Sequence, residues 1–172
     1  AFRQAFSKPS SRRGRCLIPA DGYFEWQEAP AGVRGARKQP YYLQHADGEL
    51  LAMAGVWDSW QSAQGELFES FAVLTIAPNL EAGAIHERMP VLIAKDDRQR
   101  WLHGNTSEAS ALLRTAPDGS LRTHAVDRRM SSARIDDAQC IAPVSLDAPN
   151  EDSPETNPAA SDSHEDRQGR LL

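Results

Sequence analysis

The sequence predicts an α+β domain that is built mostly from antiparallel β-strands, with a few helices late in the chain. Short segments rich in β-branched and aromatic residues recur over much of the 172-residue chain, which is typical of strands. Glycine and proline separate these segments and mark turns. Neither standard glycine-rich phosphate loop occurs, and no regular strand–helix alternation indicates a parallel sheet.

Four strands are predicted in the first third of the chain. Residues 16–19 form a short apolar run, and a turn separates them from a strand over residues 23–27. Residues 40–45 and 50–58 flank the turn sequence Ala-Asp-Gly at 46–48. This arrangement predicts that the two segments pair as a β-hairpin.

The next part of the chain contains the longest strand candidate, residues 67–77, which we expect at the centre of a sheet. Residues 78–87 are expected to be irregular. Residues 96–103 begin with acidic side chains and end before Gly104, which predicts a helix. The remaining expected elements are a strand over 89–94, a helix over 106–113, and closing strands over 121–126 and 140–144.

The net charge of −5 is concentrated at the C-terminal end. Residues 147–172 hold seven acidic residues, two arginines and no aromatic residue, so they cannot bury enough apolar surface to fold. We expect a disordered acidic tail behind one domain of residues 1–146. Residues 1–16 carry five basic residues and no acidic one, which indicates either a phosphate-binding arm or a solvated surface.

The chain has two cysteines, Cys16 and Cys140, and neither an export signal nor an apolar run long enough to cross a membrane. Two lone cysteines are typical of reduced thiols, so we expect a cytoplasmic protein without a membrane partner. The histidines show no metal-ligand spacing, so no metal site is predicted. No cofactor is expected either.

The first stretch with candidate chemistry surrounds Glu25. In a strand, Glu25 shares a face with Tyr23 and Gln27, whereas Phe24 and Trp26 share the other. Partial burial of a carboxyl group raises its pKa and suits it to proton transfer near neutral pH. The alternative is an edge strand whose glutamate simply faces water.

The second stretch is His86-Glu87-Arg88, which lies at a predicted junction between a loop and a strand. It is not a zinc-protease helix, because no second histidine follows four positions later and Pro90 would break the helix. A single histidine can act in general acid–base catalysis, although it is more often structural or merely exposed.

Taken together, the two stretches are similar to the paired signature of the SOS response-associated peptidase (SRAP) family. The stretches read RCLIPADGYFEW at 15–26 and IHERMP at 85–90, and a threonine-containing strand precedes the second. The match spans about residues 2–144. It implies a SRAP-like fold, a mostly antiparallel, barrel-like sheet with a few flanking helices.

The resemblance implies an abasic site processing protein that acts on single-stranded DNA in the DNA damage (SOS) response. In that family, the amine and thiolate of an N-terminal cysteine attack the ring-opened sugar aldehyde. A Schiff base forms first, and the sulfur then closes a thiazolidine ring, which leaves a DNA–protein crosslink. The same cysteine is credited with autoproteolysis, so the family implies peptidase (hydrolase) and abasic-site lyase activities.

Five residues match positions of the family's site. The resemblance implies that Glu25 transfers protons during Schiff-base formation and ring closure, and that His86 promotes opening of the deoxyribose and reversal of the crosslink. Arg88 is expected to contact phosphate. Trp26 is expected to stack on a nucleobase. Thr75 lies where the family has a threonine near the bound DNA.

The sequence departs from the family at its start. Residue 1 is Ala1 instead of cysteine, and the family's Cys-Gly-Arg start and the segment preceding Phe2 are absent. Cys16 cannot replace the N-terminal cysteine, because its amine is part of a peptide bond. We therefore expect an N-terminally truncated, poorly stable, monomeric chain that does not crosslink DNA alone.

Two other functions are compatible with these residues. A Cys–His hydrolase would use Cys16 and His86, and it would need a lowered thiol pKa at Cys16. A noncovalent single-stranded DNA-binding module would use Trp26, Arg88 and the basic residues of 1–16, and its affinity would fall steeply with salt.

Overall fold

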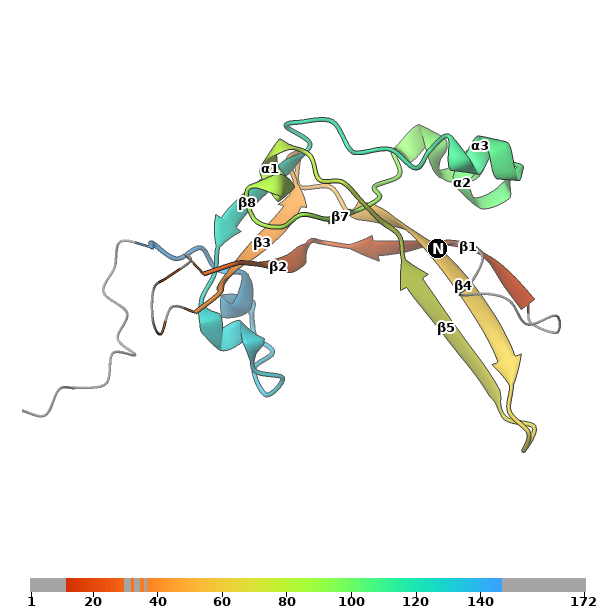
Figure 1. The fold of residues 1–172 in the computed structure, drawn as a ribbon, viewed down its shortest axis with the longest axis horizontal. Helices are drawn as coiled ribbons and strands as arrows, with labels where there is room; N and C mark the ends of the chain where they lie inside the picture. The colour runs from red at the N-terminus through yellow and green to blue at the C-terminus, as the bar shows by residue number, and fades with distance from the viewer. Residues whose placement is uncertain (1–11, 30–31, 33–34, 36, 147–172) are drawn as a thin grey trace, which may run out of the picture.

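The computed structural model describes residues 12–29, 32, 35 and 37–146 (Figure 1). The strands within these ranges are β1 (Arg12–Ala20), β2 (Tyr23–Gln27), β3 (Gln39–His45), β4 (Leu51–Gln61), β5 (Leu67–Val73), β6 (Thr75–Ile76), β7 (Met89–Pro90) and β8 (Leu121–Ala125). They form two three-stranded sheets, β1-β4-β5 and β2-β3-β8, and a two-stranded sheet of β6 and β7. All of these pairings are antiparallel.

Helices are few and short, so the mixed class with mostly antiparallel strands is confirmed. The described strands do not close into a barrel, because the two larger sheets keep separate edges. The helical elements of the described ranges are α1 (Leu80–Gly83), η1 (Lys95–Asp97), α2 (Arg98–His103), α3 (Thr106–Ser110), η2 (Arg128–Ser131) and η3 (Ala138–Ile141), where η denotes a 3-10 helix.

The predicted hairpin of residues 40–45 and 50–58 is wrong in its pairing. The turn itself forms, since Gly48 has φ +77° and its N–H donates to the carbonyl of His45 at 3.0 Å. However, β3 and β4 belong to different sheets, because β1 and β5 occupy both edges of β4. Turn chemistry sets the local chain direction, whereas the choice of partner depends on which edges are free. The hairpin that does form joins β4 to β5.

Residues 67–77 lie at a sheet edge and not at the predicted centre. Among the described strands, β5 pairs only with β4, and its side chains are almost all exposed. The segment is also interrupted at Leu74, whose N–H donates to the carbonyl of Ala54 at 2.9 Å. The central strand is β4, with β1 and β5 on its two edges, and its residues Leu51–Val56 are buried, with Met53 and Ala54 packed in the core.

The late elements match the prediction in part. The helix predicted over 96–103 is confirmed as η1 and α2, and the strand over 121–126 as β8. Residues 78–87 contain the short helix α1, where only irregular structure was expected. Residues 140–144 begin in η3 and contribute only a single bridge from Pro143 to Val126, so the last predicted strand is wrong.

Two clusters of buried side chains hold these elements together. One joins β3, β4 and β8 to α1 and the loop after it, and its members include Leu43, Met53 and Ile85. The other lies under α2 and α3 around Trp101, which is 1% exposed and donates its indole N–H to the carbonyl of Cys16 at 2.8 Å. The first cluster supports the segment that carries His86.

Candidate functional site

The loop that carries His86 is anchored on both sides. Asn79 is 5% exposed and caps α1, accepting from the N–H of Ala82 at 3.1 Å and donating to the carbonyl of Pro117 at 3.2 Å. The N–H of His86 donates to the carbonyl of Ala82 at 2.9 Å. Met89, which begins β7 just after the loop, is 1% exposed. These contacts leave His86 little freedom to move away from the body of the molecule.

Strand β2 brings Glu25 to the same place. The alternation of a strand puts Glu25 and Gln27 on one face. Gln27 donates its side-chain amide to the carbonyl of Ala84 at 2.8 Å, two residues before His86. This hydrogen bond ties β2 to the loop after α1, so it holds the two candidate residues side by side.

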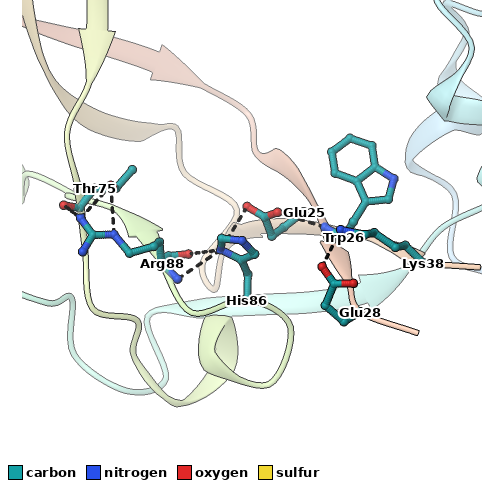
Figure 2. Close-up of polar contacts among 7 residues, drawn as sticks. All are labelled: Glu25, Trp26, Glu28, Lys38, Thr75, His86 and Arg88. Atoms are coloured by element: carbon teal, nitrogen blue, oxygen red, sulfur yellow. Dashed lines mark hydrogen bonds and ion pairs between the residues drawn. The ribbon is translucent and has the colours of Figure 1, made fainter. Parts of the chain in front are cut away.

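Glu25 and His86 are 61 positions apart in the chain, yet Glu25 Oε2 lies 3.9 Å from His86 Nδ1 (Figure 2). Their side chains are 27% and 37% exposed, respectively, so both remain accessible to a substrate. The other carboxylate oxygen, Oε1, accepts the N–H of Trp26 at 3.1 Å. Glu25 is therefore oriented by the main chain of its own strand, with Oε2 directed at the imidazole.

The imidazole is also held by the main chain of Arg88. The N–H of Arg88 lies 3.1 Å from His86 Nδ1, and the carbonyl oxygen of Arg88 lies 3.2 Å from the same nitrogen. A main-chain N–H can only donate and a carbonyl oxygen can only accept, so Nδ1 has a main-chain partner on Arg88 in either tautomer of the ring.

The guanidinium of Arg88 is bound to Thr75 of β6. Arg88 Nε and Nη2 donate to the hydroxyl of Thr75 at 3.2 and 2.9 Å, and Nη2 also donates to the carbonyl of Thr75 at 2.5 Å (Figure 2). The structure therefore brings four of the five predicted site residues into one chain of contacts, from Thr75 through Arg88 and His86 to Glu25.

Trp26, the fifth predicted residue, lies apart from this chain. Its indole points away from Glu25 in Figure 2, as expected for neighbouring residues of a strand. The indole N–H lies 3.4 Å from the hydroxyl of Ser131 in η2. Beyond it on the same strand end, Glu28 forms an ion pair with Lys38 at 2.5 Å. Trp26 therefore borders the opposite face of β2 from the Glu25–His86 pair.

Tyr23 adds a buried polar group beneath the same face of β2. Burial, and secondarily the negative charge of Glu25, raise the pKa of its hydroxyl well above the usual range. Within the described part of the chain, this hydroxyl has no hydrogen-bond partner. Tyr23 therefore stays neutral, and it packs against the first buried cluster below Glu25.

Cys16 lies in a different environment from His86. Burial raises the pKa of its thiol, which disfavours the thiolate that a nucleophile needs. It lines a cavity with Trp57 and Phe71 of the β4–β5 hairpin. The contacts of His86 are instead with Glu25 and Arg88. This geometry gives no support to a Cys–His hydrolase.

The structure describes only some of the basic residues that precede β2. Arg15 donates to the carbonyls of Trp101 and Gly104 at the C-terminal end of α2. Its guanidinium is therefore already hydrogen-bonded within the fold, next to the negative end of the helix dipole. Arg3 and Lys8 lie outside the described residues. The predicted acidic tail, residues 147–172, also lies outside them.

Within the described ranges, no helix has the length and hydrophobicity that crossing a membrane requires. No group of three or more histidine, cysteine, aspartate or glutamate side chains gathers there in a way that could hold a metal ion.

Residues 1–133 match the family model described as SOS response associated peptidase (SRAP), which is more than half of the chain. The chain belongs to the SRAP family.

The relatives of this SRAP chain include proteins named for abasic site processing. Abasic site processing protein HMCES of Gallus gallus is 30% identical over 172 aligned residues, covering 87% of this chain and 49% of that protein. Abasic site processing protein YedK of Escherichia coli is 30% identical, covering 80% of this chain and 61% of that protein. The SRAP chain thus spans about half to three fifths of the length of these relatives.

A solved structure shares the fold of this SRAP chain. The crystal structure of a protein from Bacteroides thetaiotaomicron matches with a TM-score of 0.68 and 26% identity, covering 81% of this chain and 62% of that one. A second crystal structure, of a protein from Bordetella bronchiseptica, matches with a TM-score of 0.57 and 29% identity over 66% of this chain.

The sequence analysis assigned no role to two residues that position the site of this SRAP chain, Gln27 and Asn79. Strand alternation already placed Gln27 on the face of Glu25, which is the signal that could have indicated its role. Asn79 carries a weaker signal, because asparagine is a common helix N-cap but α1 is too short to show helical periodicity. Their partners, Ala84 and Pro117, are distant in sequence and could not have been predicted.

Proposed function

We propose that this SRAP chain carries the acid–base and DNA-contacting parts of a site that processes abasic sites in single-stranded DNA. The observation that carries the proposal is the 3.9 Å approach of Glu25 Oε2 to His86 Nδ1 at a partly exposed surface. Relatives named for abasic site processing support the substrate class.

The proposed chemistry uses two proton transfers. An abasic deoxyribose is a cyclic hemiacetal, and it opens to an aldehyde when its ring oxygen gains a proton and its hydroxyl group loses one. When the ring of His86 is protonated on both nitrogens, it gives the hydrogen on Nε2, on the side of the ring away from Arg88, to the ring oxygen and becomes neutral. Glu25 accepts the hydroxyl proton and returns it to the aldehyde oxygen as the amine attacks, after which it can accept the proton that the amine loses.

The aldehyde then reacts with an amine to form a Schiff base with loss of water, and a thiolate adds to this imine to close the thiazolidine. In the family, an N-terminal cysteine supplies both groups, whereas residue 1 of this sequence is Ala1. Residues 12–146 are assigned the proton transfers and the DNA contacts. The autoproteolysis implied by the family would use the same nucleophile.

Two residues are proposed to hold the DNA strand. Arg88 uses Nε and Nη2 on Thr75, which leaves Nη1 to contact a phosphate beside His86. Trp26 offers an indole face to an unpaired base on the other side of β2. Stacking on a single side chain requires a base that is free of its pairing partner, so these contacts favour single-stranded DNA.

The test joins residues 2–172 to an N-terminal segment that begins with the family's Cys-Gly-Arg start, so that a cysteine leads the chain. The chimera is incubated with a labelled single-stranded oligonucleotide that contains one abasic site, and the products are separated on a denaturing gel. We expect a covalent band. Glu25→Gln and His86→Ala should each slow its formation by about 10²–10⁴-fold, the range of general acid–base catalysis.

Glu28→Gln is the matched control for this assay. Glu28 also lies next to β2 but pairs with exposed Lys38, so its loss should leave the rate unchanged. Crosslinking at the unmodified rate by both the Glu25 and His86 variants would refute the assigned roles. Saturable, salt-sensitive binding with no covalent band in any chimera would favour the noncovalent DNA-binding module instead.

A further inference from the structure

A cavity of about 450 Å³ lies between the start of β4, the segment that leads into η1, and the loop between α3 and β8. Its volume is within the range of about 300–1,000 Å³ that is typical of small-molecule sites. Among the described residues that line it, none is one of the five predicted site residues. The cavity is therefore a second candidate site, in addition to the Glu25–His86 pair.

One part of the cavity wall is apolar and comes from three separate segments of the chain. Its members are Leu51, Leu92, Leu112 and Ala116. Leu51 and Leu112 are only 2% and 4% exposed and belong to the two buried clusters, so the core holds them in place. A fixed apolar wall of this kind suits a hydrocarbon or aromatic group, which leaves water when it binds.

The charged part of the wall has an excess of positive side chains. Lys95, Arg98 and Arg114 line the cavity together with Glu49 and Asp97. Asp97 pairs with Arg114 at 3.3 Å, whereas Glu49 is exposed to solvent. Lys95 and Arg98 therefore leave the wall with a positive charge that an anionic group would balance.

Arg98 carries the observation that points to a ligand. Its Nε is buried but has no hydrogen-bond partner within the described part of the chain. The adjacent carboxylate of Asp97 pairs with Arg100 and Arg114 instead, at 3.2 and 3.3 Å. Buried polar atoms are nearly always hydrogen-bonded in proteins, and a guanidinium binds carboxylate and phosphate oxygens especially well. An anion in the cavity would satisfy this donor.

We propose that this cavity binds a small anion with an apolar body. The carboxylate or phosphate group of the ligand pairs with Arg98, and the body lies against Leu92 and Leu112. The proposal does not depend on the processing of abasic sites, because it uses no residue of the Glu25–His86 pair or its contacts.

The experiment titrates the ¹⁵N-labelled full chain with phenylbutyrate, which joins a carboxylate to an aromatic ring, and follows the main-chain amide signals. Phenylbutanol lacks the charge of this probe, and acetate lacks its apolar body. We expect saturable shifts at residues 92–98 and 112–116 with phenylbutyrate, and binding of the other two that is weaker by about tenfold or more. Phenyl phosphate, titrated in the same way, shows which of the two anionic groups the cavity prefers.

Substitutions on the two parts of the wall test the assigned contacts. Arg98→Gln removes the charge and should weaken the binding of phenylbutyrate by about tenfold or more. Arg100→Gln is the matched control, since Arg100 lies on the same helix but is not among the residues that line the cavity, and it should leave the affinity unchanged. Ala116→Phe fills the cavity without changing its charge, should abolish binding, and decides the question if Arg98→Gln does not fold.

Three results would overturn the proposal. The first is the absence of saturable shifts with both phenylbutyrate and phenyl phosphate. The second is an affinity that stays the same in Arg98→Gln and Ala116→Phe, or that phenylbutanol matches. The third is a set of shifts confined to β5, which would mean that the probe adheres to exposed side chains such as Phe71.

Discussion

The segment that carries His86 and the hairpin of β4 and β5 are supported in opposite ways. The first is short and irregular, but buried side chains such as Asn79 and Met89 anchor it at both ends. The second is regular and fully paired along β4, yet Leu67 and Phe71 are 67% and 63% exposed. Figure 1 shows the hairpin extending away from the rest of the molecule.

This comparison shows that main-chain pairing between strands and burial of side chains against the rest of the molecule are separate sources of support. Strand β5 forms because its main chain pairs with β4, but little of its apolar surface is removed from water. The loop at His86 lacks regular structure, but its buried residues hold it in one place. A site needs the second kind of support, since a displacement of about 1 Å at the reacting groups can cost about 10²-fold in rate.

The largest effect that tests this contrast comes from comparing two tryptophans. Trp101→Ala should lower the free energy of unfolding by about 3–5 kcal/mol, because the indole is 1% exposed and fills the cluster under α2 and α3. Trp60→Ala should cost far less, since Trp60 is 45% exposed and stacks on Phe68 of the hairpin. Urea unfolding measures both, and equal losses would mean that the hairpin is as tightly packed as the body.

A smaller loss in the free energy of unfolding is expected when Asn79, which anchors the loop before His86, is replaced. Asn79→Ala removes a helix cap and leaves buried groups unpaired, so the free energy of unfolding should fall by about 1–3 kcal/mol. The crosslinking rate of the chimera should fall as well, since Asn79 holds the loop before His86. Urea unfolding and the gel assay measure the two effects.

Asn105 provides the control for this prediction, because it caps α3 through an equivalent side-chain bond to the N–H of Glu108. Asn105→Ala should cost about 0.5–2 kcal/mol and leave the crosslinking rate unchanged. A loss of rate in both variants would show that stability alone accounts for the effect.

The smallest change in the free energy of unfolding is expected when an exposed residue of the β4–β5 hairpin, Phe71, is replaced. Phe71→Ser should change the free energy of unfolding by no more than about 0.5 kcal/mol, as is usual for exposed positions, and it should raise the solubility of the chain. Denaturant unfolding and the soluble concentration at saturation provide the measurements. A loss of about 2 kcal/mol would mean that Phe71 is packed, and the contrast with the site segment would no longer hold.

The sequence predicted individual strands better than their partners. The strand of residues 23–27 and the turn at 46–48 both form, because residue preferences and glycine conformation act over a few neighbouring residues. The partner of residues 40–45 was wrong, and so was the central place of residues 67–77. Both errors arise because pairing depends on which strand edges remain free after the whole chain has folded.

For the site, the sequence by itself determined the chemistry that is present: a carboxylate in an aromatic strand, an imidazole in a loop, and a guanidinium two residues later. The tertiary structure alone decided that Glu25 and His86 face each other, that Thr75 binds Arg88, and that Trp26 lies on the other face of β2. These arrangements depend on contacts such as that of Gln27 with Ala84, between residues 57 positions apart. No local pattern encodes such a contact, because its formation requires the packing of β2 against the loop after α1.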